Sequence, residues 1–387
     1  MNEEDAGQLL SWLGGQQEAM ATLLERLARE ESPSVDAGTQ EGAFRILSHE
    51  LEGLGFAIRR VRGRGVGDHL YARPSHRRRD AAWQLLVGHL DTVWPQGTLQ
   101  RMPVRREGDR LSGPGTYDMK GGLVQMLFAL RALQWARAVP GVPPVVLVNS
   151  DEEIGSPDST RHLRRLACGA ARALILEPSF GKAGSLKTAR KGIGRFELRI
   201  VGRASHAGLA PEKGVSAILE LSHQVQSLFA LNDVSRGVTV NVGTIEGGLR
   251  ANVIAPEASA VIEARVPTAE AAAEVETAIR GLRPHQEAVR LEVDGGFGRP
   301  PLEPTPRNRN LWEAARDAAG ELGIELSEAA VGGASDGNTT SRFTATLDGL
   351  GPIGEGAHAP DEYVLVSRMP ERAALLALLL ELQGEVG

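Results

Sequence analysis

The chain has 387 residues, which is long enough for two or more domains. Its net charge of −6 gives no basic surface of the kind that nucleic acid selects, and no apolar run approaches the roughly 18 residues of a membrane span. Cys168 is the only cysteine, and the acidic residues 3–5 have the wrong charge for a signal peptide. We therefore expect a cytoplasmic protein without disulfides and without a nucleic-acid or membrane partner.

The first predicted elements are two helices and two strands. Apolar residues recur at helical spacing over 16–29 and again over 39–54. Strands are predicted at 67–73 and 83–89, and the second of these is apolar until it ends on His89.

A nearby aspartate can orient the histidine that ends the strand 83–89. His89 and Asp91 are two positions apart, and side chains at this spacing point the same way in an extended segment. We therefore expect Asp91 to hydrogen-bond the far nitrogen of His89 and to fix its tautomer, as a metal-ligating imidazole requires. Taken alone, such a pair is more often part of a polar turn than of a metal site.

Carboxylates follow three later segments of the same kind. They are Asp118 in the glycine-rich turn 113–122, Asp151, Glu152 and Glu153 after an apolar strand that begins at Pro144, and Glu177 after another apolar strand over 173–176. Ligands of an open α/β sheet collect at the carboxyl ends of the strands, so these acids should converge with His89. Several like charges in one crevice repel, and a multivalent cation would explain their proximity.

The pattern changes at about residue 190. Residues 190–297 predict a compact β-α-β-β-α-β unit of ferredoxin-like type, with elements at 194–201, 215–229, 238–244, 252–266, 268–282 and 288–293. A helix over 311–322 then resumes the earlier pattern. We predict an α/β catalytic domain formed by 1–189 and 298–387, with a central mixed sheet flanked by helices, and an inserted domain at 190–297.

Six motifs together resemble the dinuclear zinc carboxypeptidase and deacylase family, which includes glutamate carboxypeptidases, acetylornithine deacetylases, succinyl-diaminopimelate desuccinylases and aminoacylases. In order, they are Gly88-His89-Leu90-Asp91-Thr92-Val93, the turn from Gly115 to Gly122 with Asp118, Asp151-Glu152-Glu153-Ile154-Gly155-Ser156, Glu177-Pro178, Ala204-Ser205-His206-Ala207-Gly208 and Gly356-Ala357-His358. The resemblance covers nearly the whole chain and is strongest to the glutamate carboxypeptidases, through 202–212 and 332–336.

The resemblance implies a zinc-peptidase fold that holds two Zn²⁺ ions per chain, for which Co²⁺ or Mn²⁺ can substitute. Asp118 would bridge the two ions, His89 and Glu177 would complete one, and Glu153 and His358 would complete the other. Nitrogen and carboxylate ligands of this kind suit zinc. The resemblance also implies a cis peptide bond after Asp118.

Catalytic roles also follow. Adjacent residues at a strand end face different directions, so Glu152 would not reach the metal that Glu153 binds and would serve as general base. Asp91 would support His89. The resemblance implies that His206 stabilises the oxyanion of the neighbouring subunit in a homodimer formed through the inserted domain, which would serve as a dimerisation and lid domain. A capping histidine is the structural alternative for His206.

The resemblance implies that Arg265 pairs with the free α-carboxylate of the substrate, with weaker assignments for Arg190, Asn252 and Gly333. An arginine on an alternating strand can also be a solvated residue. The expected activity is glutamate-carboxypeptidase-like hydrolysis of a small peptide or N-acyl amino acid. The alternatives are an N-acyl amino acid deacetylase or aminoacylase, and a non-catalytic family member that acts as a binding protein. The retained Glu152 argues against the last.

Overall fold

The computed structural model describes residues 3–78 and 81–384, and the chain divides into two compact units. The second unit comprises residues 189–303 together with the short segment 331–334, and the first contains the remainder. The predicted insertion, 190–297, falls inside the second unit. Within the described residues, no helix is both long enough and apolar enough to cross a membrane.

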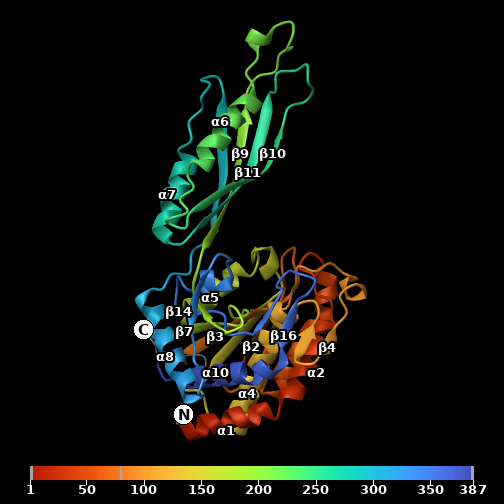
Figure 1. Cartoon of the computed structure of the whole chain (residues 1–387), viewed down its shortest axis with the longest axis vertical. Coiled ribbons are helices and arrows are strands. Elements are labelled where there is room, and N and C mark those ends of the chain that lie inside the picture. Colours follow the sequence, from red (N-terminus) through yellow and green to blue (C-terminus); the bar gives the residue numbers. More distant parts are fainter. Residues whose placement is uncertain (1–2, 79–80, 385–387) are drawn as a thin grey trace. The chain divides into compact units, whose positions relative to one another are not determined.

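A six-stranded mixed sheet forms the centre of the first unit (Figure 1). Its strands, in spatial order, are β1 (Phe56–Val61), β2 (His69–Pro74), β6 (Pro144–Asn149), β3 (Trp83–His89), β7 (Ala170–Ile175) and β14 (Ala345–Leu347). The four strands from β6 to β14 run parallel, whereas β1 and β2 are antiparallel to their neighbours. Strands β3 and β6 are apolar along their length because both of their faces are buried.

Helices cover both faces of this sheet, which confirms the predicted fold class. One core contains residues of α1 (Glu3–Gly14), α2 (Gln17–Ala28), α3 (Glu41–Gly53), α4 (Gly121–Trp135), α8 (Pro306–Glu321) and α10 (Met369–Glu381). A separate core lies under α5 (Thr160–Ala167), and α9 (Asp336–Thr340) packs against α5 and β7.

Helix α1 is absent from the sequence prediction. It buries Ala6, Leu9 and Leu13 in the larger core. The acidic residues in its first turn are a signal for a helix start, because negative side chains are favourable at the N-terminal end of a helix.

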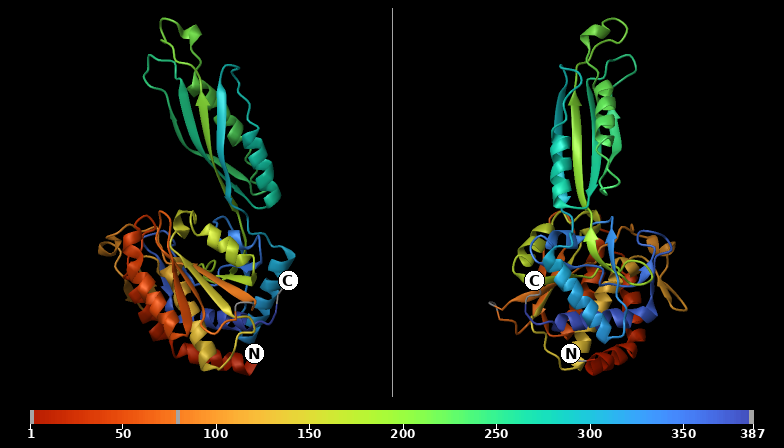
Figure 2. Two further views of the ribbon diagram at one scale, coloured as in Figure 1. Left: turned by 180° about the vertical axis from the view of Figure 1, so that it is seen from behind. Right: turned by 60° about the vertical axis from the view of Figure 1, so that its left-hand side comes forward.

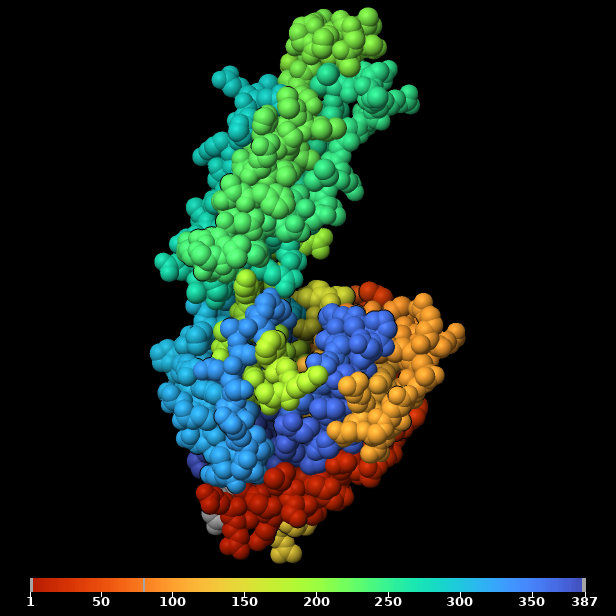
Figure 3. All heavy atoms as spheres, in the orientation of Figure 1, coloured from red at the N-terminus to blue at the C-terminus, as the bar shows by residue number. Residues whose placement is uncertain are grey.

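A small four-stranded sheet connects segments that are far apart in the sequence. Its order is β15 (Gly354–Glu355), β16 (Tyr363–Leu365), β5 (Arg110–Ser112) and β4 (Arg105–Glu107). Figure 3 shows the blue atoms of the β15–β16 region beside the orange atoms of the β4–β5 region. The sheet therefore brings the segment before Asp118 next to the segment that carries His358. A further two-stranded sheet pairs β8 (Leu186–Arg190) with β13 (Glu328–Val331).

The second unit has the predicted β-α-β-β-α-β order (Figure 2). Its elements are β9 (Gly192–Val201), α6 (Ala217–Phe229), β10 (Thr239–Gly247), β11 (Glu257–Val266), α7 (Ala269–Arg280) and β12 (Arg290–Arg299). The strands form an antiparallel sheet in the order β10-β11-β9-β12. The strand predicted at 252–266 begins only at Glu257, because Pro256 has no N–H to donate to a ladder.

Two glycines position the turn that carries Asp118. Gly115 has φ +71°, a conformation that other residues rarely adopt. A Cβ at Gly122, in the first turn of α4, would lie 2.0 Å from the main-chain oxygen of Leu176. This close approach places the start of α4 directly against the segment that continues to Glu177.

Candidate metal centre

Two histidines and four carboxylates meet at the carboxyl ends of the central strands. His89 is the last residue of β3, Glu177 follows β7, and Glu152–Ile154 form a single helical turn after β6. Asp118 lies in the turn before α4, and His358 lies between β15 and β16. This arrangement agrees with the predicted convergence on His89 for the four carboxylates of the cluster. It does not for Asp151, whose Oδ2 instead accepts hydrogen bonds from the backbone N–H groups of Asp158 and Ser159 at 2.8 and 3.1 Å.

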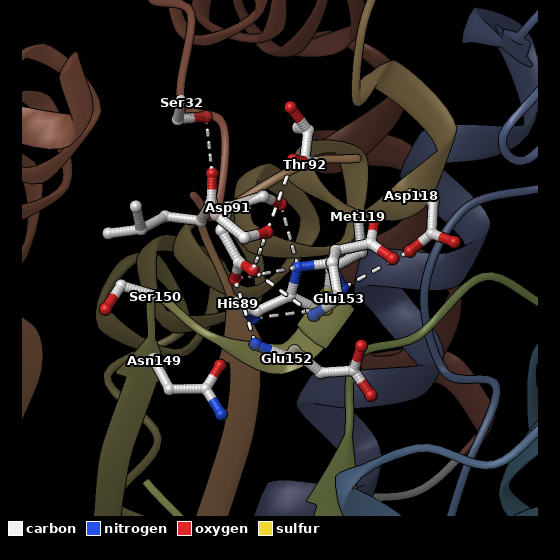
Figure 4. Close-up of polar contacts among 12 residues, drawn as sticks. Ser32, His89, Asp91, Thr92, Asp118, Met119, Asn149, Ser150, Glu152 and Glu153 are labelled. Carbon is white, nitrogen blue, oxygen red and sulfur yellow. Dashed lines mark hydrogen bonds and ion pairs between the residues drawn. The ribbon is translucent and has the colours of Figure 1, made fainter. Parts of the chain in front are cut away.

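The carboxylate of Asp118 lies between the two imidazoles. Its Oδ1 is 3.2 Å from Nε2 of His89, and its Oδ2 is 3.4 Å from Nε2 of His358. Glu153 Oε2 is 3.0 Å from the same nitrogen of His358, and Glu177 Oε1 is 3.5 Å from that of His89. Each histidine therefore faces Asp118 and one glutamate, as Figure 4 shows for His89 and Asp118. The peptide bond between Asp118 and Met119 is cis, which confirms that prediction.

Five of these six side chains, all except His358, form two overlapping groups of potential metal ligands. Ligand atoms of His89, Asp118 and Glu153 lie within 4.8 Å of one another, and so do those of His89, Glu152 and Glu177. Glu152 and Glu153 thus belong to different groups, but strand alternation is not the reason. Strand β6 ends at Asn149, and the two glutamates are consecutive residues of the 3-10 turn Glu152–Ile154, so helical geometry sets the directions of their side chains.

Asp91 contacts His89 through its main chain more closely than through its carboxylate. Nδ1 of His89 is 3.0 Å from the main-chain oxygen of Asp91 and 3.5 Å from Oδ1. The predicted side-chain contact is the longer one because the extended segment ends at His89. The Asp91 carboxylate instead accepts hydrogen bonds from Ser34 Oγ at 2.6 Å and from the backbone N–H groups of Glu152 and Glu153 at 3.3 and 3.2 Å. It therefore anchors the acidic turn as well.

The charges in this cluster shift its pKa values strongly. Burial alone would lower the pKa of His89, but hydrogen bonds to Asp118 and the neighbouring carboxylates raise it well above the ordinary value. Asp118 and Glu153 raise the pKa of His358 to about 10. Burial would raise the pKa of Asp118, but the two histidines outweigh burial and lower it. The cluster therefore attracts positive charge, and a bound cation would displace protons from the histidines.

Glu362 is a residue that the sequence analysis missed. It is 1% exposed, and its Oε1 accepts hydrogen bonds from the backbone N–H groups of Tyr117 and Asp118 at 2.9 and 3.1 Å. Its Oε2 accepts from the backbone N–H of Gly115 at 3.1 Å and from the indole N–H of Trp94 at 3.0 Å. This single carboxylate thus holds the turn that presents Asp118. Burial raises the pKa of Glu362 to about 7, against the opposing effect of these donors.

In the second unit, the backbone fixes the tautomer of His206. Nδ1 of the exposed His206 accepts hydrogen bonds from the N–H groups of Gly208 and Leu209, both at 3.1 Å. The ring hydrogen of neutral His206 therefore lies on Nε2, where it can be donated. Asn252 lies beside this loop, since its main-chain oxygen accepts from Ala207 N at 3.0 Å.

The two candidate substrate arginines hold the loop 331–334 of the second unit. Arg265 donates to the main-chain oxygen of Gly332 at 3.0 Å and also pairs with Glu263 at 2.8 Å. Arg190 is 5% exposed and donates to the main-chain oxygen of Gly333 at 3.1 Å. Burial and this backbone contact favour a supporting role for Arg190, whereas Arg265 is more exposed.

Comparisons with known proteins identify relatives of this chain. Residues 85–382 match the sequence profile of Peptidase family M20/M25/M40. Carboxypeptidase G2 from Pseudomonas sp. (strain RS-16) is 32% identical over 377 residues, which cover 94% of this chain and 89% of that protein. Succinyl-diaminopimelate desuccinylase from Nitrosospira multiformis is 30% identical over 388 residues, with 94% and 97% covered.

A solved structure has the same fold. The Bacillus subtilis YXEP protein, a dinuclear metal-binding peptidase, superposes with a TM-score of 0.68 and 15% identity, and the match covers 94% of this chain and 98% of that one.

We expect Glu362→Gln to weaken metal binding at the cluster by at least about tenfold. The amide offers one acceptor oxygen where four N–H groups now converge, and an unsatisfied buried N–H costs roughly 1–3 kcal/mol. Metal retained after dialysis against graded chelator, measured by elemental analysis, checks this. Asp361→Asn, an exposed neighbour, is the matched control. Parent-like retention by Glu362→Gln would contradict a role in presenting Asp118.

Proposed function

We propose that this chain, which belongs to Peptidase family M20/M25/M40, uses two metal ions to release an amino acid with a free α-carboxylate from a peptidyl or acyl group. Metal-dependent amide-bond hydrolysis is the chemistry of the family. The observation that carries the two-metal proposal is the position of Asp118, each of whose oxygens faces a different histidine.

Two Zn²⁺ ions, or Co²⁺ or Mn²⁺ in their place, fit the residues that are present. Asp118 would bridge them, His89 and Glu177 would hold one, and Glu153 and His358 would hold the other. The donors are imidazole nitrogens and carboxylate oxygens, as zinc prefers. Among residues 3–78 and 81–384, Glu153 Oε1 is buried and has no hydrogen-bond partner, so a cation would satisfy it. The YXEP protein, which has the same fold, is a dinuclear metal-binding peptidase, and this supports a two-metal site here.

Glu152 is then the general base. The five other residues complete both ligand sets without it, and its carboxylate still lies with the cluster. Divalent cations bound here would polarise an amide carbonyl and lower the pKa of a water molecule. Glu152 would take the proton of the attacking water and return it to the leaving amine nitrogen. The carboxylate of Asp91 keeps Glu152 in place by accepting a hydrogen bond from the backbone N–H of Glu152.

His206 and Arg265 are the proposed substrate contacts of the second unit. The Nε2–H of His206 is free of the backbone contacts that engage Nδ1, and it can donate to the oxyanion of the tetrahedral intermediate. The guanidinium of Arg265 would pair with the free α-carboxylate, in competition with Glu263. Asn252 and Gly333 lie on loops adjoining these two residues and would support them.

A deacylase is the second candidate. The desuccinylase relative is 30% identical over nearly its whole length, so the same metal chemistry could remove an acyl group from an amino acid. A binding protein without catalysis is less consistent with the site, because Glu152 would then have no reason to remain beside a complete ligand set.

A panel of N-acyl glutamates, other N-acyl amino acids and dipeptides should identify the substrate. We expect release of a C-terminal amino acid, glutamate foremost, with rates measured by chromatography of the free amino acid. Glu152→Gln should retain its metal yet be slower by roughly 10²- to 10⁴-fold, the usual effect of a lost general base. This control excludes a contaminating hydrolase. Activity confined to N-acetyl or N-succinyl substrates would favour the deacylase, and no turnover of any member would contradict both.

We further propose that two copies pair through the second unit. Ile218 and Leu219 on α6, together with Ile245 and Leu249 at and beyond the end of β10, are exposed apolar side chains. Strand β10 is also an edge strand, which leaves backbone groups for pairing. A second copy of the same chain would cover both features in a two-fold dimer, and His206 would then serve the site of its partner.

Subunit exchange tests this role of His206. His206→Ala homodimers should be nearly inactive because one oxyanion donor contributes about 10²- to 10³-fold in rate. Glu152→Gln homodimers should be nearly inactive because they lack the general base. After mixing, hybrid dimers would contain one intact site, made of the His206→Ala metal centre and the histidine of the other chain. With half of the dimers hybrid, activity should return to roughly a quarter of the parent's. If exchange is verified with differently tagged chains and activity stays at baseline, His206 does not act across a dimer.

A further inference from the structure

A groove of about 470 Å³ lies at the β1–β2 end of the central sheet, on the face that carries α5. Arg59 pairs with Tyr71 and Ala57 with Arg73 in the β1–β2 register, so these four side chains share one face. Helix α5 provides the opposite wall through His162, Arg165 and Leu166, and Leu147 of β6 lies in the lining. The left-hand view of Figure 2 shows the orange strands of this end of the sheet with the yellow-green α5 near them. The groove shares no residue with the candidate metal centre.

Three guanidinium groups line this groove without a carboxylate partner in the described part of the chain. They belong to Arg59, Arg73 and Arg165; Arg73 donates only to the main-chain oxygen of Pro74 at 3.3 Å. Three acids of the surrounding described segments pair with other arginines. Glu41 and Asp68 pair with Arg60, and Asp158 pairs with Arg161 at 2.8 Å, although neither arginine lines the groove. The walls therefore carry uncompensated positive charge.

The remaining lining is apolar or neutral. Leu147 is buried, and Leu166 and Tyr71 extend the core under α5 to the groove. Burial lowers the pKa of His162, and Arg161 lowers it further, so this imidazole is neutral at physiological pH. His162 Nε2 accepts from Nε of Arg161 at 3.2 Å, which leaves Nδ1–H as a donor. The groove thus combines an apolar floor with guanidinium donors in its walls, a composition typical of a small-molecule site.

The cluster His69, Asp158 and His162 behind this groove is not a convincing metal site. Its ligand atoms lie within 4.8 Å of one another. However, the Asp158 carboxylate already accepts from His69, from Arg161 and from the backbone N–H of Arg64. A cation would have to displace the guanidinium of Arg161, so these contacts hold the α5 wall of the groove in place instead.

We propose that the groove binds a small organic anion with an apolar body, a carboxylate or a phosphate monoester. Guanidinium groups form paired, charge-assisted hydrogen bonds with either head group. The volume suits a single small molecule, since ligand pockets are typically about 300–1,000 Å³. Binding an anion also offsets the mutual repulsion of the three arginines.

Titration with aromatic probes tests this site. The metal-loaded protein is titrated with 2-naphthoate and with 1-naphthyl phosphate, and the neutral 2-naphthamide is the control ligand. We expect at least one of the two anions to bind, more weakly as salt rises, and to bind at least about tenfold more tightly than the amide. The tighter anion identifies the head group.

Matched variants locate the binding. Arg59→Gln/Arg165→Gln should lower the affinity at least about tenfold, and Arg73→Gln should lower it independently. Arg164→Gln removes the same charge from an exposed position of α5 outside the groove and should bind as the parent does. All three arginines of the groove are at least partly exposed, so the variants should fold, which thermal unfolding checks. An anion held at the metal centre would be insensitive to these substitutions. Parent-like affinity in the double variant, or equal binding of acid and amide, would overturn the proposal.

Discussion

The structure depends on keeping four carboxylates together in one largely buried place. Asp118, Glu152, Glu153 and Glu177 lie at the carboxyl end of a sheet whose interior is apolar, where like charges repel strongly. Without cations, the two histidines partly compensate, which is why their pKa values are raised. Two divalent cations would compensate far better, and cations bound here could also polarise an amide carbonyl and lower the pKa of a water molecule.

Much of the surrounding chain serves to hold these charges in position. Asp91 accepts from the backbone of the acidic turn, and Glu362 accepts from the backbone of the Asp118 turn. Both anchors are themselves carboxylates that point at N–H groups, so they orient the site without offering it a further ligand. The close approach of Gly122 to Leu176 then holds the turn that carries Asp118 next to the segment that carries Glu177.

The sequence predicts the fold and the convergence of the candidate ligands well. It predicts poorly the residues that hold these ligands in position. Apolar strands that end in His89 or Glu177 are local patterns, and the order of motifs carries the assignment of each proposed ligand. Glu362 could not be found in this way, because its partners in the turn are about 244 to 247 residues away and no spacing rule relates them. Strand alternation predicts the wrong orientation for Asp91, because β3 ends at His89. Patterns thus identify residues within one element, whereas contacts between distant loops need the folded chain.

Metal stoichiometry tests the central claim most directly. Elemental analysis of the purified parent and of Asp118→Ala, both reconstituted with Zn²⁺ and dialysed, gives the number of ions per chain. If Asp118 bridges two ions, the parent holds two and the variant holds at most one. One ion in the parent, or two ions retained by the variant, would contradict the account.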